Sequence, residues 1–561
     1  MKNIKRMPEN NQISQLENEV ARLNKKITKY EAIELKQNRF GLVWLDVPEA
    51  FEDDVENKLP ILEEVPKLAI KNKDGKPTHL LIEGDNYHAL TCLNYTHKGK
   101  VDVIYIDPPY NTGSDGFKYK DKRFLKEYPD GTEVPVDHPL RHSYWLSFMR
   151  KRLELARELL SDSGVMLISI DDNEVAQLKL LCSEIFKNDG FVDVMVWKKS
   201  GFSRDGKMKN TTTFRKDHEY IVICFKNRKK LNKAQEIPNF QGKLSNPDND
   251  PRGNWLSGSI SRKESASNKN HKNYYVVISP NGKRFTRQWD IPEEKFKKLN
   301  KDNRIYWGEK KKNVPRVKIF QDEERIITPY SVLLDKGTTT DGTKEVSELL
   351  GKDCTALRPK PTKLIEFLIQ LSSRNDSIIL DFFAGTGTTG HSAINLNKKT
   401  NGKRQFILCT NNEGKIMTNY CYPRIKKIIK EAGGNIKYYK TAFVGKNNIL
   451  KADDADKIEL AHNAGDMLAI AENTLNQVEQ NNYWQIFENE KQNTAVYFRE
   501  EFSKFDNFVE KVRKLKKPAV VYIFSWEKEF EFNDFDNDKN IKIKTIPQPI
   551  LEIYKQIYNL V

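Results

Sequence analysis

Hydrophobic and polar positions alternate between two rhythms over residues 61–196. Short apolar runs at 80–85, 101–107 and 165–170 are typical of buried strands, and residues 143–160 have helical spacing. Strand-like runs that alternate with helix-like segments predict βαβ units, in which helices cover a parallel sheet. This part of the chain therefore predicts an α/β fold.

The same rhythm returns after a long interruption. Residues 360–373 have helical spacing, the strand-like run 377–381 and a further helix follow, and the run 405–410 completes a second α/β block. Residues 451–561 carry a strand–helix–strand pattern around 495–498 and 519–524. At 561 residues the chain is expected to hold several domains.

The interruption, residues 197–330, is rich in turn signals and contains one clear apolar strand at 219–225. Between 261 and 320 there are 17 Lys and Arg against 6 Asp and Glu, which is most of the net charge of +16, and eight aromatic residues are interleaved. A basic, aromatic-rich segment favours a polyanionic partner, although a solvated charged surface has the same composition.

The two ends of the chain differ from this middle part. A heptad-like seam near the N-terminus predicts a charged helix that packs on its own domain or forms a dimeric coiled coil. Residues 451–561 hold 15 Lys and Arg against 20 Asp and Glu, so we expect this region to contact protein rather than DNA. The seam consists of Ile13, Leu16, Val20, Leu23, Ile27 and Tyr30.

Cysteine usage and hydropathy place the chain in a cellular class. The six cysteines form no CxxC pair, which indicates reduced structural thiols and no metal site. No apolar stretch approaches the roughly 18–20 residues of a membrane helix, and no apolar leader begins the sequence. We therefore expect a cytoplasmic protein without a membrane partner.

The run VDVIYIDPPY at 101–110 ends an apolar strand in an acid, two prolines and a tyrosine. Pro108 and Pro109 cannot continue a sheet ladder and stiffen the chain that follows. Asp107 and Tyr110 are then held at the rim where open α/β sheets bind ligands. A strand that ends in a simple proline turn is the alternative.

A second motif, DFFAGTGTTG at 381–390, directly follows the strand-like run SIIL. A strand that ends in Asp, a Gly-x-Gly turn and a helix form a cofactor-binding arrangement, because Gly385 and Gly387 let the backbone approach a ligand closely. A tight strand–helix turn without a ligand is the alternative. The sequence contains no GxxxxGK[ST] loop, so we expect no nucleotide hydrolysis by this chain.

Together the two motifs resemble those of S-adenosylmethionine-dependent amino-methyltransferases. The order, with DPPY before FAGTG, is similar to that of the permuted class of DNA adenine-N6 methyltransferases, and above all to the modification (Mod) subunits of type III restriction–modification systems. The likeness covers about residues 80–450. The segments that carry it are LIEGDNYHAL (81–90), DPPYNTGSDGFKY (107–119), the ISIDDNE run (168–174), HEYIV (218–222), RPKPTKLIEFL (358–368) and LDFFAGTGTTGHS (380–392).

The resemblance implies a Rossmann-like α/β methyltransferase sheet with an inserted target-recognition domain and a small C-terminal α/β domain. The expected order is an N-terminal helical segment (1–60), the first half of the methyltransferase domain (61–196), the target-recognition domain (197–330), the second half (331–450) and a C-terminal interaction domain (451–561).

The first motif is expected to form the base pocket. Adenine's exocyclic amine is a poor nucleophile because its lone pair is delocalised, and an acceptor beside it favours attack. Asp107 suits that role, and in the family the rigid Pro108–Pro109 pair fixes a backbone carbonyl as a second acceptor. Tyr110 would stack on a flipped base, a contact worth about 1–3 kcal/mol. Asp at the first position is typical of adenine-specific enzymes, whereas cytosine-N4 enzymes more often have Ser.

The second motif and its surroundings are expected to hold S-adenosylmethionine. In the family, Lys360 would meet the methionine carboxylate and Asp85 would lie near the cofactor adenine; a lysine at a helix start and a helix cap are the alternatives. Thr410 stands where many relatives carry an acid for the ribose, and Glu413 is a possible substitute. The full set is Asp85, Lys360, Asp381, Phe383, Ala384, Gly385, Gly387, Thr388 and Glu413.

The basic segment occupies the place of the target-recognition domain. Its Lys and Arg would neutralise phosphates, and some Arg, Asn or Gln would read base edges in the major groove. The sequence does not separate these roles. The candidates are Arg252, Arg284, Arg287, Gln288 and Arg304.

The resemblance also implies double-stranded DNA as substrate, a homodimer and a separate helicase–nuclease restriction subunit. An orphan or type II methyltransferase and cytosine-N4 methylation are alternatives within the same chemistry. A non-catalytic DNA-specificity subunit, with S-adenosylmethionine as allosteric ligand, is the alternative from another class, and the intact DPPY argues against it. Methylation of RNA or of a protein glutamine is disfavoured because relatives there usually have Asn in place of Asp107.

Overall fold

The fold is that of a computed structural model, in which the chain divides into two compact units. Residues 1–233 and 330–561 form the first unit, and residues 234–329 form the second. The structure describes residues 35–37, 43–45, 59–72, 74–112, 142–186, 190–201, 214, 216–227, 244–320, 329–444, 454–498, 504–524, 535, 538–544 and 546.

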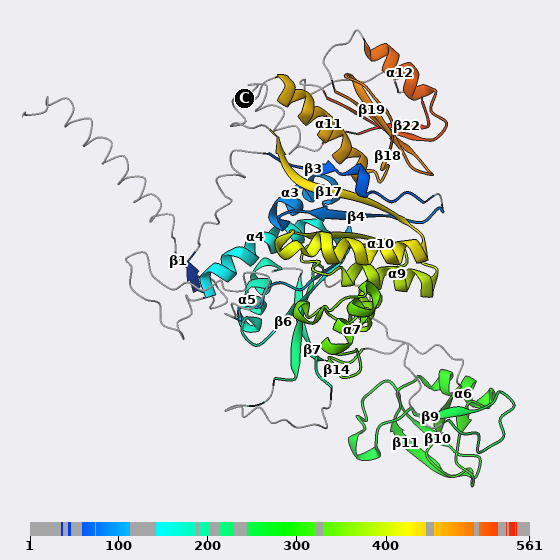
Figure 1. Cartoon of the computed structure of the whole chain (residues 1–561). Coiled ribbons are helices and arrows are strands. Elements are labelled where there is room, and N and C mark those ends of the chain that lie inside the picture. The colour runs from blue at the N-terminus through cyan, green and yellow to red at the C-terminus, as the bar shows by residue number, and fades with distance from the viewer. Residues whose placement is uncertain are drawn as a thin grey trace, which may run out of the picture. The chain divides into compact units, whose positions relative to one another are not determined.

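A large mixed sheet is the centre of the first unit (Figure 1). β5, β6, β15, β16 and β4 are parallel, and β17 joins β4 in the same direction, whereas β8 is antiparallel to β6 and β7. In spatial order the strands are β14 (Val332–Leu333), β7 (Phe191–Lys198), β8 (His218–Phe225), β6 (Leu160–Ile170), β5 (Val101–Ile106), β15 (Ile378–Asp381), β16 (Gln405–Thr410), β4 (Thr78–Glu83), β17 (Asn435–Val444) and β3 (Leu59–Glu64).

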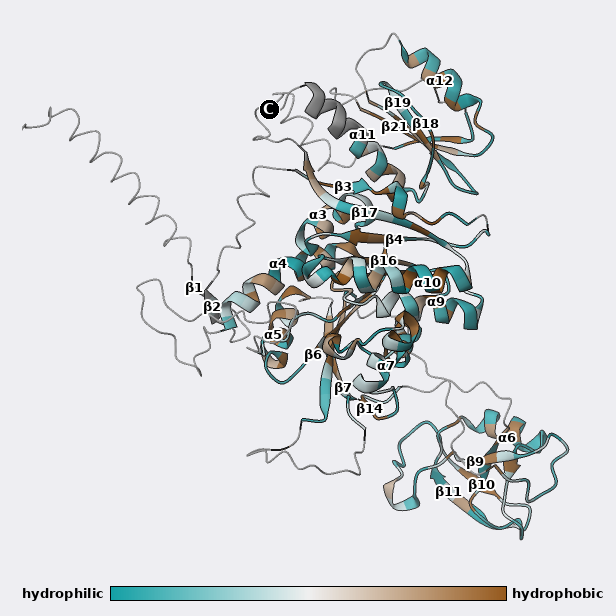
Figure 2. Ribbon diagram, viewed as in Figure 1, coloured by the Kyte–Doolittle hydropathy of each residue, from teal (hydrophilic) through white to brown (hydrophobic). Residues whose placement is uncertain are grey.

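Helices cover both faces of this sheet, which explains why its central strands are apolar throughout. Ile104 and Ile106 of β5 point to one core, with α3 (Asn86–His97), α4 (Ser143–Leu159) and α5 (Val175–Ile185). Val103 and Tyr105 point to the opposite core, with α8 (Thr362–Ser372), α9 (Thr388–Thr400) and α10 (Tyr422–Ala432). Figure 2 shows the hydrophobic strands β4 and β16 between these more polar helices.

The α/β class predicted from the sequence is confirmed, and the large sheet draws on both α/β blocks. Two details differ from the predicted elements. β6 begins at Leu160, five residues before the predicted strand-like run 165–170. The sequence placed β8 in the interrupting segment, but β8 pairs with β6 and β7 in the large sheet. This position agrees with the burial of its residues on both faces.

The described part of the second unit, residues 244–320, holds two small antiparallel sheets and one α-helix. β9 (Trp255–Ser259), β12 (Ile305–Tyr306) and β13 (Arg316–Phe320) form one sheet, and β10 (Tyr274–Ile278) pairs with β11 (Arg284–Gln288). With α6 (Glu293–Lys301) they surround an aromatic core that includes Trp289, Phe296 and Trp307. Lys318 is fully buried, and its ammonium lies 2.7 Å from Asp250.

The C-terminal part of the first unit carries a five-stranded sheet in the order β18 (Asn476–Gln480), β19 (Trp484–Glu488), β20 (Asn493–Tyr497), β21 (Ala519–Ile523) and β22 (Ile541–Ile543). α12 (Phe505–Arg513) lies between β20 and β21 in the sequence, as the strand–helix–strand pattern predicts, and α11 (Asp454–Ala471) precedes the sheet.

Outside these elements, β1 (Leu35–Gln37) pairs with β2 (Val43–Leu45), and α7 (Thr339–Leu350) precedes α8. The predicted heptad seam lies outside the described residues. All six cysteines are free and buried. Within the described part of the chain, no helix combines the length and the apolar character needed to cross a membrane.

Candidate active site

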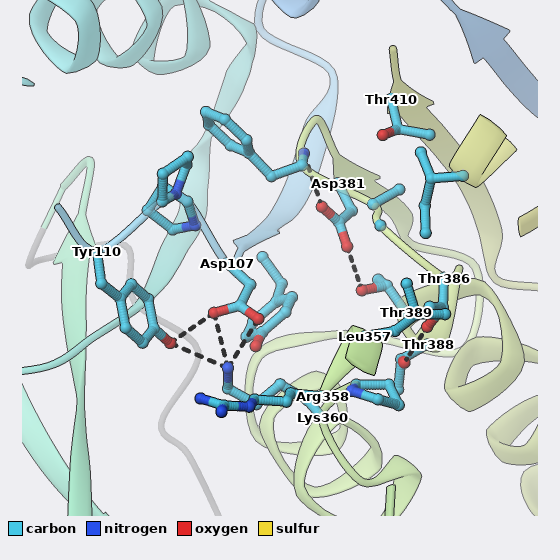
Figure 3. Close-up of a pocket in the computed structure, with 18 of the residues that line it drawn as sticks. Asp107, Tyr110, Leu357, Arg358, Lys360, Asp381, Thr386, Thr388, Thr389 and Thr410 are labelled. Atoms are coloured by element: carbon cyan, nitrogen blue, oxygen red, sulfur yellow. Dashed lines mark hydrogen bonds and ion pairs between the residues drawn. The ribbon is translucent and has the colours of Figure 1, made fainter. Parts of the chain in front are cut away.

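The two sequence motifs meet because the strands before them are neighbours. Ile379 and Leu380 of β15 pair with Val103 and Ile104 of β5 in parallel register, so both strands end at the same edge of the sheet. The residues that follow, 107–110 from β5 and 381–386 from the end of β15, line one cavity of about 810 Å³ (Figure 3). Ligand pockets in proteins commonly have about 300–1,000 Å³.

A lysine binds the acid and the tyrosine of the first motif. The Lys360 ammonium donates to the two Asp107 carboxylate oxygens at 2.8 and 2.7 Å and to the Tyr110 hydroxyl at 3.0 Å. The Tyr110 hydroxyl itself donates to Asp107 at 2.6 Å. Figure 3 shows the three side chains converging at one end of the cavity.

Glu219 of β8 completes a cluster of opposite charges. Its carboxylate lies 3.4 Å from the Lys360 ammonium and 3.2 Å from that of Lys199. Burial disfavours the charged Lys360, but the carboxylates of Asp107 and Glu219 outweigh this effect and raise the pKa of Lys360. Burial and the same carboxylates raise the pKa of Tyr110 well above its usual value, so its hydroxyl keeps its proton.

Hydrogen bonds from neighbouring segments hold the turn after β5 in place. The Trp145 indole donates to the Pro109 carbonyl at 2.8 Å. Asn111 has a φ of 59°, and its amide donates at 2.6 Å to the Glu174 carboxylate, which also bonds His142 at 2.7 Å. The backbone of the DPPY turn is therefore fixed by side chains from α4 and from the segments before α4 and α5.

The second motif forms a tight, buried turn. Asp381 is 2% exposed and accepts hydrogen bonds from the Phe383 backbone N–H at 3.0 Å and from the Thr389 hydroxyl. Burial raises the pKa of Asp381 to about 7, although these two hydrogen bonds favour its charged form. This carboxyl group thus titrates near neutral pH.

The two glycines of this turn have different tasks. Gly385 has a φ of +50°, and a Cβ there would meet only the Phe383 carbonyl at 3.9 Å, so the position opens to the cavity. Gly387 has a φ of +80°, and its Cβ would press on Cys421 at 3.1 Å and on Ile425. Gly387 is therefore needed for the turn and its packing. The absence of a side chain at Gly385 leaves the adjoining part of the cavity open.

Two arginines support residues that line the cavity. The buried Arg424 donates to the hydroxyls of Thr386 and Thr388, at 3.1 and 2.8 Å, and burial lowers its pKa to about 10. Asp85 caps α3 by accepting from the Tyr87 N–H at 2.8 Å, and Arg152 lies 3.6 Å from its carboxylate. The helix-cap alternative for Asp85 is thus real, and Asp85 still lines the cavity.

The structure brings together most of the residues expected from the sequence. All four DPPY residues line the cavity, and so does every expected cofactor residue except Gly387. The Lys360 ammonium lies on Asp107, so its contact with a methionine carboxylate stays a prediction. Several other lining residues were not singled out from the sequence, although all of them except Phe148 and Lys199 lie in segments that carry the family resemblance. They are Asn86, Phe148, Asp171, Lys199, Glu219, Thr386 and Thr389.

The five expected DNA-contacting residues lie in the second unit and differ in their surroundings. Arg252 is bound to Asp250 at 2.9 Å, and the Gln288 side chain is buried and accepts from the Asn268 N–H at 3.0 Å. Arg287 and Arg304 are partly buried, over the rings of Phe285 and Phe320. Arg284 is exposed.

Comparisons with known proteins agree with these motifs. A family model described as DNA methylase matches residues 101–420. The Mod subunit of the type III restriction-modification enzyme StyLTI from Salmonella typhimurium is 36% identical over 60% of this chain and 53% of its own length. The EcoP15I Mod subunit from Escherichia coli is 29% identical over 68% of this chain and 66% of its own length.

A third curated relative has the longest match of the three. The Mod subunit of the type III enzyme EcoPI from Escherichia phage P1 is 30% identical over 80% of this chain and 75% of its own length. The chain thus spans between about half and three quarters of the length of these relatives.

Proposed function

This chain belongs to the DNA methylase family, together with the type III Mod subunits, and from that premise we propose that it methylates adenine N6 in double-stranded DNA. The observation that carries the proposal is the common cavity of the DPPY and DFFAGTG turns, at the ends of the adjacent strands β5 and β15. S-adenosylmethionine is the proposed cofactor, and when bound it would supply an electrophilic methyl group.

The residues around the second turn fit this cofactor. The turn leaves space in front of Gly385, where any side chain would enter the cavity. Phe383 and Ala384 offer apolar contact, and Asp85 and Glu413 offer carboxylates to ribose or adenine donors. The cavity also has the volume that a ligand of this size requires.

The first turn fits a flipped adenine. An Asp107 oxygen would accept a hydrogen bond from the exocyclic amine, and the carbonyl of Pro108 is the second acceptor that we assign. The neighbouring carbonyl of Pro109 already accepts from Trp145. Stacking on Tyr110, worth about 1–3 kcal/mol, would offset part of the few kcal/mol that base extrusion costs.

Lys360 would orient these groups. Its ammonium binds both Asp107 and Tyr110, so it fixes the acceptor and the stacking ring relative to each other. The ammonium groups of Lys360 and Lys199 balance the carboxylates of Asp107 and Glu219, which leaves the cluster close to neutral before the base enters. In-line alignment of the reacting atoms then supplies much of the rate.

We also propose the assembly that the relatives' names imply. The chain would act as the Mod subunit of a type III system, beside a separate restriction subunit that provides translocation and cleavage. A homodimer is proposed from the family resemblance and not from these names. The second unit, with its excess of Lys and Arg, would recognise the target sequence. The acidic C-terminal part of the first unit would provide protein contacts.

The direct test is transfer of label from S-adenosylmethionine to duplex DNA by the purified protein. We expect labelled N6-methyladenine, identified by mass spectrometry of the digested DNA, and none with Asp107→Ala. Label found in N4-methylcytosine would show that the target base is cytosine and not adenine. A folded protein that labels no DNA, RNA or protein would refute methyl transfer itself.

A further inference from the structure

The paired strands β10 and β11 of the second unit, hereafter the ribbon, have two unlike faces (Figure 1). Val277 pairs with Phe285, and both are buried in the aromatic core of the unit. The neighbouring positions point the other way because side chains alternate along a strand. This outer face carries Val276 opposite Thr286 and Ile278 opposite Arg284.

The outer face exposes two apolar side chains to solvent. Val276 is 41% exposed and Ile278 is 58% exposed, and Arg284 is exposed beside them. Only the other end of this face is covered, where Gln288 is buried against the Asn268 backbone. Two β-branched aliphatic residues kept in solvent on a two-stranded ribbon indicate a surface that meets a partner.

The tip of the ribbon is held by hydrogen bonds and lies next to a group of lysines. The turn from Ser279 to Lys283 is closed by a hydrogen bond from the Ser279 N–H to the Lys283 carbonyl at 2.8 Å. The Asn281 amide donates to the Lys310 carbonyl at 2.6 Å. The exposed cations Lys310, Lys311 and Lys312, hereafter the lysine loop, are thereby fixed beside the tip.

From this arrangement we infer that the ribbon enters the major groove of duplex DNA and reads the target sequence with its outer face. The inference rests on the proposed function. The major groove, about 12 Å wide, admits a two-stranded antiparallel ribbon. Ile278 and Val276 suit the methyl groups of thymine, Arg284 suits guanine, and the lysine loop suits the phosphates at the groove edge.

Charge decides between DNA and a protein partner for this surface. Residues 261–320 hold 17 Lys and Arg against 6 Asp and Glu; Arg284 lies opposite Ile278 of the apolar pair, and the lysine loop lies beside the adjoining tip. Phosphates would neutralise these cations and release counterions. Arg284 also differs from two of the other expected base-reading residues. Arg284 is exposed, whereas Arg252 and Gln288 are held by contacts within the unit.

The test uses the full-length protein in a host strain without methyltransferases of its own, and single-molecule sequencing reads the methylated motif. Ile278→Ser with Val276→Ser should relax one or more thymine positions. Arg284→Gln should relax a guanine position, with discrimination at each affected base pair falling about 5- to 150-fold. Val478→Ser, at an apolar position 48% exposed on β18, is the matched control and should leave the motif unchanged.

The lysine loop is tested by duplex binding at increasing salt, which needs no methyl transfer. Replacement of Lys310, Lys311 and Lys312 by Gln should weaken binding for all sequences and reduce the slope of log affinity against log salt by about 2–3. The matched control replaces the exposed Lys295, Lys297 and Lys298 of α6 by Gln, which changes the charge equally. Equal losses in both triple variants would indicate general electrostatics and overturn the inference.

The outcomes separate this inference from the proposed function. If the wild type and the ribbon variants methylate the same motif, the inference that the ribbon reads the target sequence is wrong, and the proposed function stands. If the wild type binds duplex DNA without methylating it, the function fails, and selective loss of binding by the ribbon variants still supports the groove contact. If the wild type binds no duplex, both fail.

Discussion

The Lys360 ammonium lies 2.8 and 2.7 Å from the two carboxylate oxygens of Asp107, although the two residues are 253 positions apart. Lys360 precedes α8 and Asp107 follows β5, so this ion pair ties the two α/β blocks together at the edge of the sheet. Glu219, from a third segment, lies against the same ammonium.

The first prediction concerns this ion pair. Lys360→Met would leave two carboxylates facing each other without their shared cation, and the melting temperature should fall. Combining it with Asp107→Asn should restore part of the loss, with a coupling energy of about 1–3 kcal/mol, between values for exposed and fully buried pairs. Strictly additive losses in a double-mutant cycle would show that the two residues do not interact.

The second prediction separates the ring of Tyr110 from its hydroxyl. Tyr110→Phe keeps the stacking surface and removes the hydroxyl's bonds to Asp107, Lys360 and Glu219, so methylation should stay within about tenfold of wild type. Tyr110→Ala should lose about 5- to 150-fold through the missing stack. Initial rates on duplex DNA provide the measurement. A Phe variant as inactive as the Ala variant would assign the role to the hydroxyl instead.

The third prediction uses two glycines with similar backbones. Gly385 (φ +50°) and Gly351 (φ +66°) both have open space where a Cβ would stand, and only Gly385 lines the cavity. Gly385→Leu should abolish S-adenosylmethionine binding in calorimetry. Gly351→Leu, at the end of α7, carries comparable backbone strain and should leave that affinity unchanged. Equal affinities for both variants would remove the FAGTG turn from the cofactor site.

The fourth prediction follows from the raised pKa of Asp381, about 7 against an ordinary value of 3.8. Between these values the unfolded chain has lost the proton that the folded protein keeps. The stability contributed by this group is therefore complete below about pH 4 and is lost as the pH rises towards 7. Asp381→Asn cannot titrate, so its melting temperature should fall less than that of wild type between pH 5 and pH 7.

The control for this measurement is Asp376→Asn, at an exposed acid in the turn before β15. It should reproduce the wild-type dependence on pH. If Asp381→Asn does the same, Asp381 is ionised throughout this range, and the pH dependence has another source.

The fifth prediction tests the buried ion pair of the second unit. Lys318 is fully buried beside Asp250, and Lys318→Met would leave that carboxylate with Arg252 as its remaining cation. Loss of one partner of a buried pair typically costs about 3–5 kcal/mol. Hydrogen exchange over residues 244–320 should accelerate, with little change in the large sheet. Lys297→Met, which breaks an exposed pair on α6, should change exchange little.

The sequence alone determined the class of fold and the two turns of the site. A short apolar run such as 103–106 predicts a strand that is buried on both faces, and Pro108, Pro109, Gly385 and Gly387 restrict or free the backbone locally. Such effects act over a few residues, so they can be predicted from short sequence motifs. Family resemblance added the expectation that the two motifs share a ligand.

Tertiary structure decided which distant residues meet. Strand order placed β15 beside β5, brought Glu219 and Lys199 to the DPPY side of the cavity, and put the Lys360 ammonium on Asp107. It also showed that Arg252 is tied to Asp250 whereas Ile278 stays exposed. Contacts between segments hundreds of residues apart depend on the register of the sheet and on burial, and no local pattern in the chain encodes either.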